Sequence, residues 1–251
     1  SRTTYADALH QSGALDEAEK QFRDAETMQQ QRQPDYRYLY SLRGFLFCDL
    51  LLSRGHAREV LQRYEKLVEW RLPSDSLLDF ALEELSAGRA HLLLALEKHP
   101  ELDILHPERS RGMAHASTAL SVTQLSHAET HMQRAVTGLR EAGQQQYLPL
   151  GLFALAELRR EQHNFAAARE LLHEAQEIAE RGEMKLHLTD FHLQACKLLL
   201  AEAGGGRTED GKEKMKSARE HVEAAALLVE HTCYHRRDAE VAALQAEIGE
   251  N

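Results

Sequence analysis

The sequence predicts an all-α protein, built as a solenoid of stacked helical hairpins. Of the 251 residues, 43% are hydrophobic but only 6% are aromatic, and five are proline. A core made mainly of Leu and Ala suits closely packed helices better than sheets. Small or apolar residues also recur at a period of about 40 residues, as from Ala18 to Val60 and from Ala128 to Ala168, which indicates repeated helix pairs.

Five helix pairs and a terminal cap are expected to form a single superhelical domain over residues 1–251. Two of the pairs are expected to carry insertions, at 97–124 and 203–212. The expected pairs are 1–31, 36–70, 77–142, 147–181 and 187–231, followed by a capping helix at 234–248.

Glycines mark the turns of the first two pairs. Gly13 lies in the first turn, and Ala18 and Phe22 then share one face of the following helix because their spacing matches the helical period. Gln-Pro-Asp at 33–35 ends this pair, since a proline disfavours helix in the residue before it. Gly55 marks the turn of the second pair.

The third pair begins after the break at 72–75, where Ser74 or Asp75 is the expected N-cap. A long helix at 77–96 follows, with Gly88 at the position of closest contact with its partner helix.

The partner of that helix is expected at 126–141, after the first insertion. Pro100 and Pro107 indicate a loop within the insertion, and the run 108–122 is capable of forming an extra helix. We expect this segment to be held less tightly than the rest.

The fourth pair, 147–180, is the least interrupted, with its turn at His163-Asn164. Gly182 is expected to end it as a left-handed glycine. The fifth pair is expected to place its helices at 187–202 and 214–231, on either side of a glycine-rich flexible loop.

These positions resemble the tetratricopeptide repeat (TPR), which has a small residue in helix A, a turn glycine, and a small, bulky, small pattern in helix B. The resemblance covers essentially the whole chain and implies a right-handed superhelix. Departures are the two insertions, His163 at the glycine position, and Val60 and Leu67 where alanine is usual. The small residues of helix A are Ala6, Cys48, Gly88, Ala156 and Cys196, and those that begin the helix B pattern are Ala18, Val60, Ala128, Ala168 and Ala218.

The runs ADALHQSGALDEAEKQFRDAE and EAQEIAERGEMKLHLTDFHL resemble more specifically the C-terminal repeats of large bacterial signalling proteins, including STAND-type NTPases. That resemblance implies a ligand-sensing array whose nucleotide-hydrolysing or effector module lies elsewhere. Because the chain is already in register with a repeat near Ser1, we expect it to be a fragment of a longer protein.

The composition of the chain argues against several classes of partner and location. The formal net charge of −10 argues against nucleic acid, because phosphate binding needs clustered Lys and Arg. No apolar run approaches the roughly 18 residues of a membrane span, and no signal peptide is seen. Three widely spaced cysteines form no disulfide or metal motif, which favours the cytoplasm.

One segment comes close to a nucleotide-binding motif. Residues 206–213 resemble a phosphate-binding loop, but such a loop needs Ser or Thr after Lys212 to hold magnesium, and Glu213 stands there. We therefore expect a flexible loop and no cofactor.

Two histidine groups could in principle bind a metal. His127 and His131 lie one helical turn apart, and His231, Cys233 and His235 are clustered near the cap. For the first group no third ligand is identifiable, and its sequence is not the H-E-x-x-H of a zinc site. We expect solvated helix surface for the first, a turn for the second, and no metal.

No catalytic constellation is apparent, and the protein is not expected to be an enzyme. Cys48 and Cys196 could be nucleophiles, but both fall at packing positions of the repeat. Trp70 could anchor a partner, but sealing the junction before Pro73 is the favoured interpretation.

The expected function is protein binding on the concave face of the array. The partner is expected to be a protein, a peptide or an adjacent domain of the same polypeptide; the alternative is a stand-alone scaffold or adaptor. A carboxylate clamp built from helix A asparagines is excluded, since the only asparagines are Asn164 and Asn251. The residues expected on the concave face are Phe45, Asp49, Leu52, Leu85, Arg89, Leu92, Phe153, Glu157, Arg160, Leu193, Lys197 and Leu200.

Overall fold

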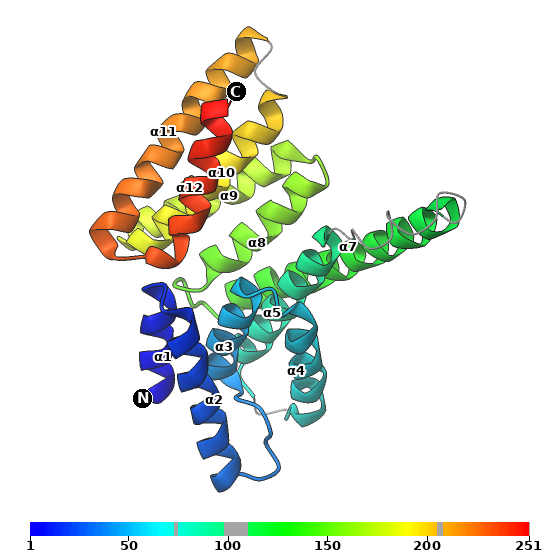
Figure 1. Cartoon of the computed structure of the whole chain (residues 1–251). Coiled ribbons are helices and arrows are strands. Elements are labelled where there is room, and N and C mark those ends of the chain that lie inside the picture. The colour runs from blue at the N-terminus through cyan, green and yellow to red at the C-terminus, as the bar shows by residue number, and fades with distance from the viewer. Residues whose placement is uncertain (73–74, 98–109, 205–207, 251) are drawn as a thin grey trace. The chain divides into compact units, whose positions relative to one another are not determined.

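The computed structural model describes residues 1–72, 75–97, 110–204 and 208–250, and it describes side chains outside 110–120 and Glu250. Every regular element in these ranges is helical, which confirms the all-α class (Figure 1). The contacts divide the chain into two compact units. Unit 1 comprises Ser1–Arg37 with Leu139–Asn251, and unit 2 comprises Tyr38–Gly138.

Unit 2 is built from α3, α4, α5 and most of α7. The helices α3 and α4 form a hairpin, and both pack on α5. Gly88 of α5 faces Ala128 and Met132 of α7. The bounds are α3 Ser41–Ser53, α4 Ala57–Trp70, α5 Leu77–Leu96 and α7 Ser110–Glu141.

Unit 1 contains two groups of consecutive helices. The first is the hairpin of α1 and α2, and the second is the series α8 to α12, in which each α-helix packs on the next. Figure 1 shows α8, α9, α10 and α11 side by side. The bounds are α1 Arg2–Gln11, α2 Leu15–Arg32, α8 Leu148–Glu161, α9 Phe165–Arg181, α10 Lys185–Ala203, α11 Glu209–Thr232, the short 3-10 helix η1 His235–Arg237, and α12 Asp238–Glu250. Adjacent packed helices of this kind are consistent with an α-solenoid.

The same turn joins helices at several places. Gly13 and Gly55 have φ of +83° and +79°, as expected for turn glycines. In each, the N–H of the glycine bonds the carbonyl three residues back and the next N–H bonds the carbonyl five residues back, which defines a Schellman motif. His163 adopts the same conformation, with φ of +57°, at the turn between α8 and α9. The departure from glycine at this position therefore leaves the turn unchanged.

The turn after α9 differs from the prediction. Gly182 has φ of −90° and is not left-handed. Glu183 takes the left-handed conformation instead, with φ of +51°, and its N–H bonds the carbonyl of Glu180. Gly182 therefore lies one residue before the left-handed position, which Glu183 occupies.

Three expected boundaries were wrong. The run 108–122 and the helix 126–141 were expected to be separate, but α7 is continuous from Ser110 to Glu141. The side chain of Ser76, rather than Asp75, caps α5 by accepting the N–H of Asp79; Ser74 lies outside the described residues. The loop 203–212 is shorter than expected, because Thr208 caps α11 and Glu209 begins it. Residues 98–109 and 205–207 of the two insertions lie outside the described residues.

Small residues lie at the helix contacts. All ten positions that the repeat pattern assigns to small side chains in helix A and helix B are buried. The terminal helix α12 was expected to cap the array, and its Val241, Leu244 and Ile248 join one core cluster with Cys196 and Val222 of α10 and α11. The apolar side of the last pair is therefore covered.

A substitution at Gly88 tests the contact between α5 and α7. A Cβ atom there would lie 2.7 Å from Cγ of Met132 and 3.3 Å from the carbonyl oxygen of Ala128. Since both helices would have to shift, Gly88→Ala is expected to lower the free energy of unfolding in urea by about 1–3 kcal/mol. The control Gly249→Ala adds a methyl group where nothing lies within 4 Å and should not destabilise the protein. Equal stability of the parent and Gly88→Ala would contradict this packing.

No helix in the described ranges combines the length and apolar character that crossing a membrane requires.

Candidate functional site

The residues expected on the concave face divide into two groups by burial. All the apolar members except Leu200 contribute mainly to the core, as does Asp49, and the other partly exposed members are charged side chains. The buried members are Phe45, Asp49, Leu52, Leu85, Leu92, Phe153 and Leu193, and the partly exposed members are Arg89, Glu157, Arg160, Lys197 and Leu200. Only the second group offers exposed surface to a partner, and within it the side chain of Arg160 is only 13% exposed.

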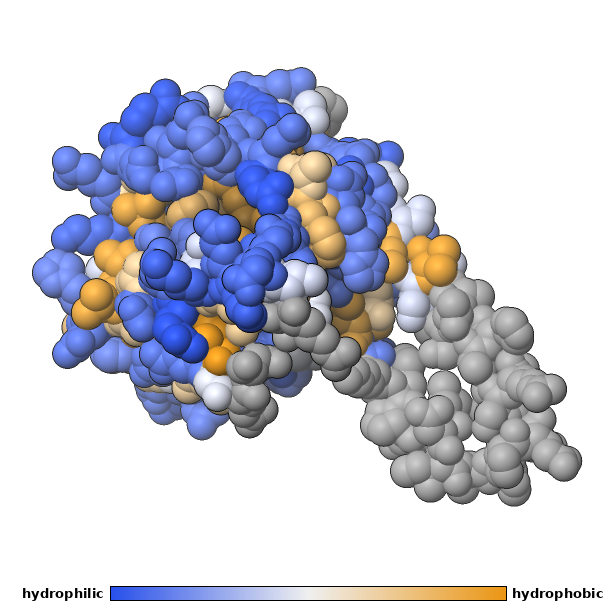
Figure 2. Space-filling view, turned by 90° about the horizontal axis from the view of Figure 1, so that it is seen from above, coloured by the Kyte–Doolittle hydropathy of each residue, from blue (hydrophilic) through white to orange (hydrophobic). Residues whose placement is uncertain are grey.

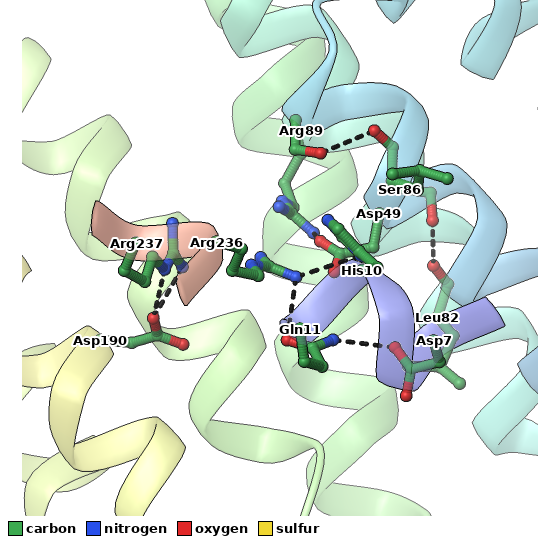
Figure 3. A network of polar contacts seen from close by, with 12 residues as sticks. Asp7, His10, Gln11, Asp49, Leu82, Ser86, Arg89, Asp190, Arg236 and Arg237 are labelled. Atoms are coloured by element: carbon green, nitrogen blue, oxygen red, sulfur yellow. Dashed lines mark hydrogen bonds and ion pairs between the residues drawn. The ribbon is translucent and has the colours of Figure 1, made fainter. Parts of the chain in front are cut away.

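In unit 2, two of these residues bind each other. Arg89 on α5 donates from Nη1 to Oδ1 of Asp49 on α3 at 2.7 Å, as Figure 3 shows. The carboxylate is nearly buried and the guanidinium is 28% exposed. The pair ties α3 to α5, and only the arginine faces solvent to any extent.

In unit 1, Arg160 on α8 combines ion pairs with an unsatisfied donor. Its Nη2 atom lies 2.8 Å from Glu161 and 3.6 Å from Glu157. Its Nη1 atom is buried and has no hydrogen-bond partner within the described part of the chain. An unmatched guanidinium N–H is costly to bury, so Arg160 would gain a hydrogen bond from a partner's acceptor if its side chain moved to expose Nη1.

Lys197 on α10 forms an ion pair with Glu240 on α12. Glu240 also accepts from Arg237 at 2.9 Å. Burial opposes ionisation of Glu240, but the charges of Arg237 and Lys197 outweigh it, and the pKa of Glu240 is lowered. The cap is thus attached to α10 by charge as well as by apolar packing.

A second polar link holds the cap segment. Asp190 on α10 is buried and accepts from Nε of Arg237 at 2.8 Å (Figure 3). The hydroxyl of Tyr234 lies 3.3 Å from both carboxylate oxygens. Cys233 itself ends α11 in the left-handed conformation, so the segment that contains His231 and His235 includes a turn, as predicted.

The most concentrated polar site in unit 2 was not foreseen from the sequence. Glu84 on α5 is 7% exposed, and its carboxylate accepts from the hydroxyl of Tyr64 and from Nδ1 of His131, both at 2.7 Å. Arg71 donates to it at 3.3 Å and to Glu83 at 2.9 Å. We call these five residues the Glu84 cluster; they come from α4, α5, α7 and the residue after α4.

The electrostatics of the cluster favour an ionised Glu84. Burial opposes the charge, but hydrogen bonds from His131, Tyr64 and Arg71 outweigh burial and lower the pKa of Glu84 to about 2. Burial and the bond to Glu84 raise the pKa of Tyr64 to about 12. At neutral pH the cluster therefore holds a buried carboxylate surrounded by donors.

Two more histidines adjoin the cluster. The ring of His91 on α5 stacks on that of His131, with centroids 5.4 Å apart and planes 9° apart, and His127 lies at 5.0 Å from His91. His131 is only 16% exposed, so the solvated surface expected for the pair applies to His127 alone. No group of three metal-ligating side chains occurs among the described residues.

The other candidates from the sequence fall in structural positions. Cys48 and Cys196 are buried, as their packing role required, and burial raises the pKa of Cys196 to about 12. Trp70 is half-buried near the ring of Tyr38, at 6.3 Å between centroids. The segment around Lys212 follows a helix and not a strand, which is unlike a phosphate-binding loop.

The fold and its polar sites define an all-α protein of packed helix pairs. Comparison of the chain with known protein families, with curated proteins and with solved structures finds no match.

Proposed function

We propose that this chain is a TPR-type protein-interaction array that binds a flexible protein segment. The observation that carries the proposal is the burial of all ten small-residue positions at the spacing of the repeat pattern. An array of this kind holds its helices close together and presents side chains from successive pairs to one ligand. The resemblance to sensor regions of bacterial signalling proteins favours a ligand-sensing role within a longer polypeptide.

Charge and exposure indicate the chemistry of the partner. The predicted surface retains Arg89, Glu157, Arg160 and Lys197 as its partly exposed charged members. The face of the molecule in Figure 2 is mostly hydrophilic, with smaller apolar areas between the polar ones. A peptide with both acidic and apolar side chains fits the partly exposed residues Arg89, Arg160, Lys197 and Leu200 better than a uniformly apolar helix does.

Arg160 and Lys197 are the residues to test, because both lie in unit 1. A displayed library of random peptides would be selected on the 251-residue chain, and the affinities of the selected peptides compared among variants. Arg160→Ala and Lys197→Ala are expected to weaken binding about tenfold or more, as expected for loss of a charged contact at the centre of an interface. Lys216→Ala, on the exposed part of α11, is the matched control and should bind as the parent does.

Two controls separate binding from folding. Circular dichroism of each variant shows whether the helices persist, and Arg160→Lys retains the positive charge without the planar guanidinium. The proposal fails if no peptide is selected, or if folded Arg160→Ala and Lys197→Ala proteins bind every selected peptide as tightly as the parent.

A further inference from the structure

Three imidazole rings meet between α5 and α7 in unit 2, beside the carboxylate of Glu84. The rings of His127 and His131 lie 5.0 and 5.4 Å from that of His91. His91 is half-buried and occupies the middle of the group. If His91 and either neighbouring ring both carry a proton, two like charges lie at most 5.4 Å apart, a separation at which charges interact strongly in a partly buried site.

The hydrogen bonds at the site leave little capacity to neutralise additional charge. His131 already contacts the carboxylate of Glu84 at 2.7 Å, and that carboxylate also accepts from Tyr64 and Arg71. Among the described residues, the hydrogen-bond partner of the His91 ring is the neutral Oε1 of Gln124, at 2.5 Å.

The charged and titratable groups linked to the rings through Glu84 and its partners come from α4, α5 and α7 and from the residue after α4. The two arginines among them match the two carboxylates in number even before a histidine is protonated. The groups are Tyr64 on α4, Arg71 after it, Glu83 and Glu84 on α5, and Arg134 on α7, which lies 4.0 Å from Glu84.

The helices α5 and α7 are closely packed near His91. Gly88, one turn before His91, lies so close to α7 that a single methyl group would meet the backbone and side chain of Met132. Because His91 and His131 stack in this tight interface, His91 has little room to move away from His131 while the helices stay in place.

We propose that the three histidines form an acid-sensitive contact, which loosens α7 from α5 as the pH falls below about 6. At neutral pH the packed rings join the two helices. In acid, protonation of His91 adds a positive charge, and within the described part of the chain its ring has no carboxylate partner to match it. This contact is a property of unit 2 and does not depend on the proposed peptide binding.

The direction of the pH effect follows from the environment of His91. Burial disfavours its charged form, and the charges of His131 and His127 add repulsion; together these outweigh the hydrogen bond to Gln124 and lower the pKa of His91. The unfolded chain, whose histidine has an ordinary pKa of about 6.5, therefore takes up the proton first. Stability is retained above that value, falls as the pH drops from about 6.5 towards the lowered pKa, and changes no further below it.

The test is urea unfolding of the full chain at several pH values between 7.5 and 5, for the parent and His91→Gln. Glutamine keeps a side-chain N–H for Gln124 but cannot take up the proton. The fall in stability with acid is expected to be smaller in His91→Gln, by a slope of up to one proton bound on unfolding. His56→Gln is the matched control, since His56 is exposed in the same unit and its loss should leave the slope unchanged.

A second histidine pair also contributes to the fall in stability at low pH, in the same direction as His91. Nδ1 of His192 lies 2.8 Å from Nδ1 of His221 in unit 1, and burial followed by the charge of His221 lowers the pKa of His192 to about 4. This contribution is present in the parent and in both variants, so it cancels in their comparison.

An independent readout is the proton NMR titration of His91, assigned by its absence in His91→Gln. His91 is expected to titrate below the ordinary histidine range. As the pH falls from 7 to 5.5, the hydrogen-exchange rates of the backbone amides of α5 and α7, corrected for intrinsic rates, should rise. The proposal is overturned if His91 titrates at or above its ordinary value, or if His91→Gln keeps the full pH dependence of the parent.

Discussion

Replacing Glu84 with alanine is expected to lower the free energy of unfolding by about 3–5 kcal/mol, because it breaks a buried, hydrogen-bonded ionic site from one side. The substitution leaves the hydroxyl of Tyr64, Nδ1 of His131 and one donor of Arg71 without their shared acceptor. Chemical unfolding at pH 7 measures the loss. Glu69→Ala is the control, because the ion pair of Glu69 with Lys66 is more than half exposed on both sides and should contribute within about 1 kcal/mol.

The pH dependence of Glu84 provides a check on the same prediction. Its folded-state pKa of about 2 lies below the ordinary value of 4.5, so its contribution is present above the ordinary value and is lost as the pH falls towards the folded value. The stability difference between the parent and Glu84→Ala should therefore shrink in acid. A loss equal to that of Glu69→Ala at pH 7 would show that the cluster does not stabilise unit 2.

The second large effect is expected at Arg63, which is buried in α4 with 1% of its surface exposed. Its guanidinium carbon lies 4.6 Å from the ring centre of Tyr38 and 4.4 Å from that of Phe47. Glu59, one turn earlier, accepts two of its N–H groups, at 2.8 and 3.1 Å. Arg63→Ala removes two cation–π contacts and leaves a cavity, so we expect a loss of about 3 kcal/mol or more in unfolding free energy.

Two further variants distinguish charge from shape at this position. Arg63→Lys keeps the charge but not the planar group that stacks between two rings, so it should recover only part of the loss. Arg58→Ala is the control on the same helix, because Arg58 is 73% exposed and pairs with Glu97 at 3.4 Å. If Arg63→Lys were as stable as the parent, the flat stacking of the guanidinium would be unimportant.

Much of the helical framework could be predicted from the sequence, because it is encoded by short-range periodicity. The small residues at Ala18, Ala128 and Ala168 recur at repeat spacing and are buried. The turn glycines Gly13 and Gly55 are left-handed as expected. Such signals depend only on residues a few positions apart, so a single sequence is enough to find them.

The errors in the framework have local physical causes. Residues 122–125 contain no glycine or proline, and a helix that has begun continues where nothing stops it, so α7 does not break there. At the end of α9 the glycine indicated a left-handed residue, but the hydrogen-bond pattern places that conformation at Glu183. Composition alone does not distinguish two adjacent turn positions.

The polar sites could not be predicted in the same way. Glu84 is 20 positions from Tyr64 and 47 from His131, and no local pattern indicates that the three meet. Arg63 was missed because a charged residue is ordinarily assigned to the solvent side of an amphipathic helix. Among the residues predicted on the concave face, the apolar ones are largely buried. The reason is that an apolar side chain that can pack against a neighbouring helix is more stable in the core than at the surface.

The cap helix α12 controls how fast a reagent in solution can reach the thiol of Cys196. Cys196 is fully buried in the cluster that α12 completes, whereas Cys233 is exposed and Cys48 is buried in α3. A thiol reagent in solution should modify Cys233 at once, but it reaches Cys196 only during moments when the surrounding helices part. The rate at which Cys196 is alkylated, followed by the mass of the adduct, therefore reports how often the last helices open.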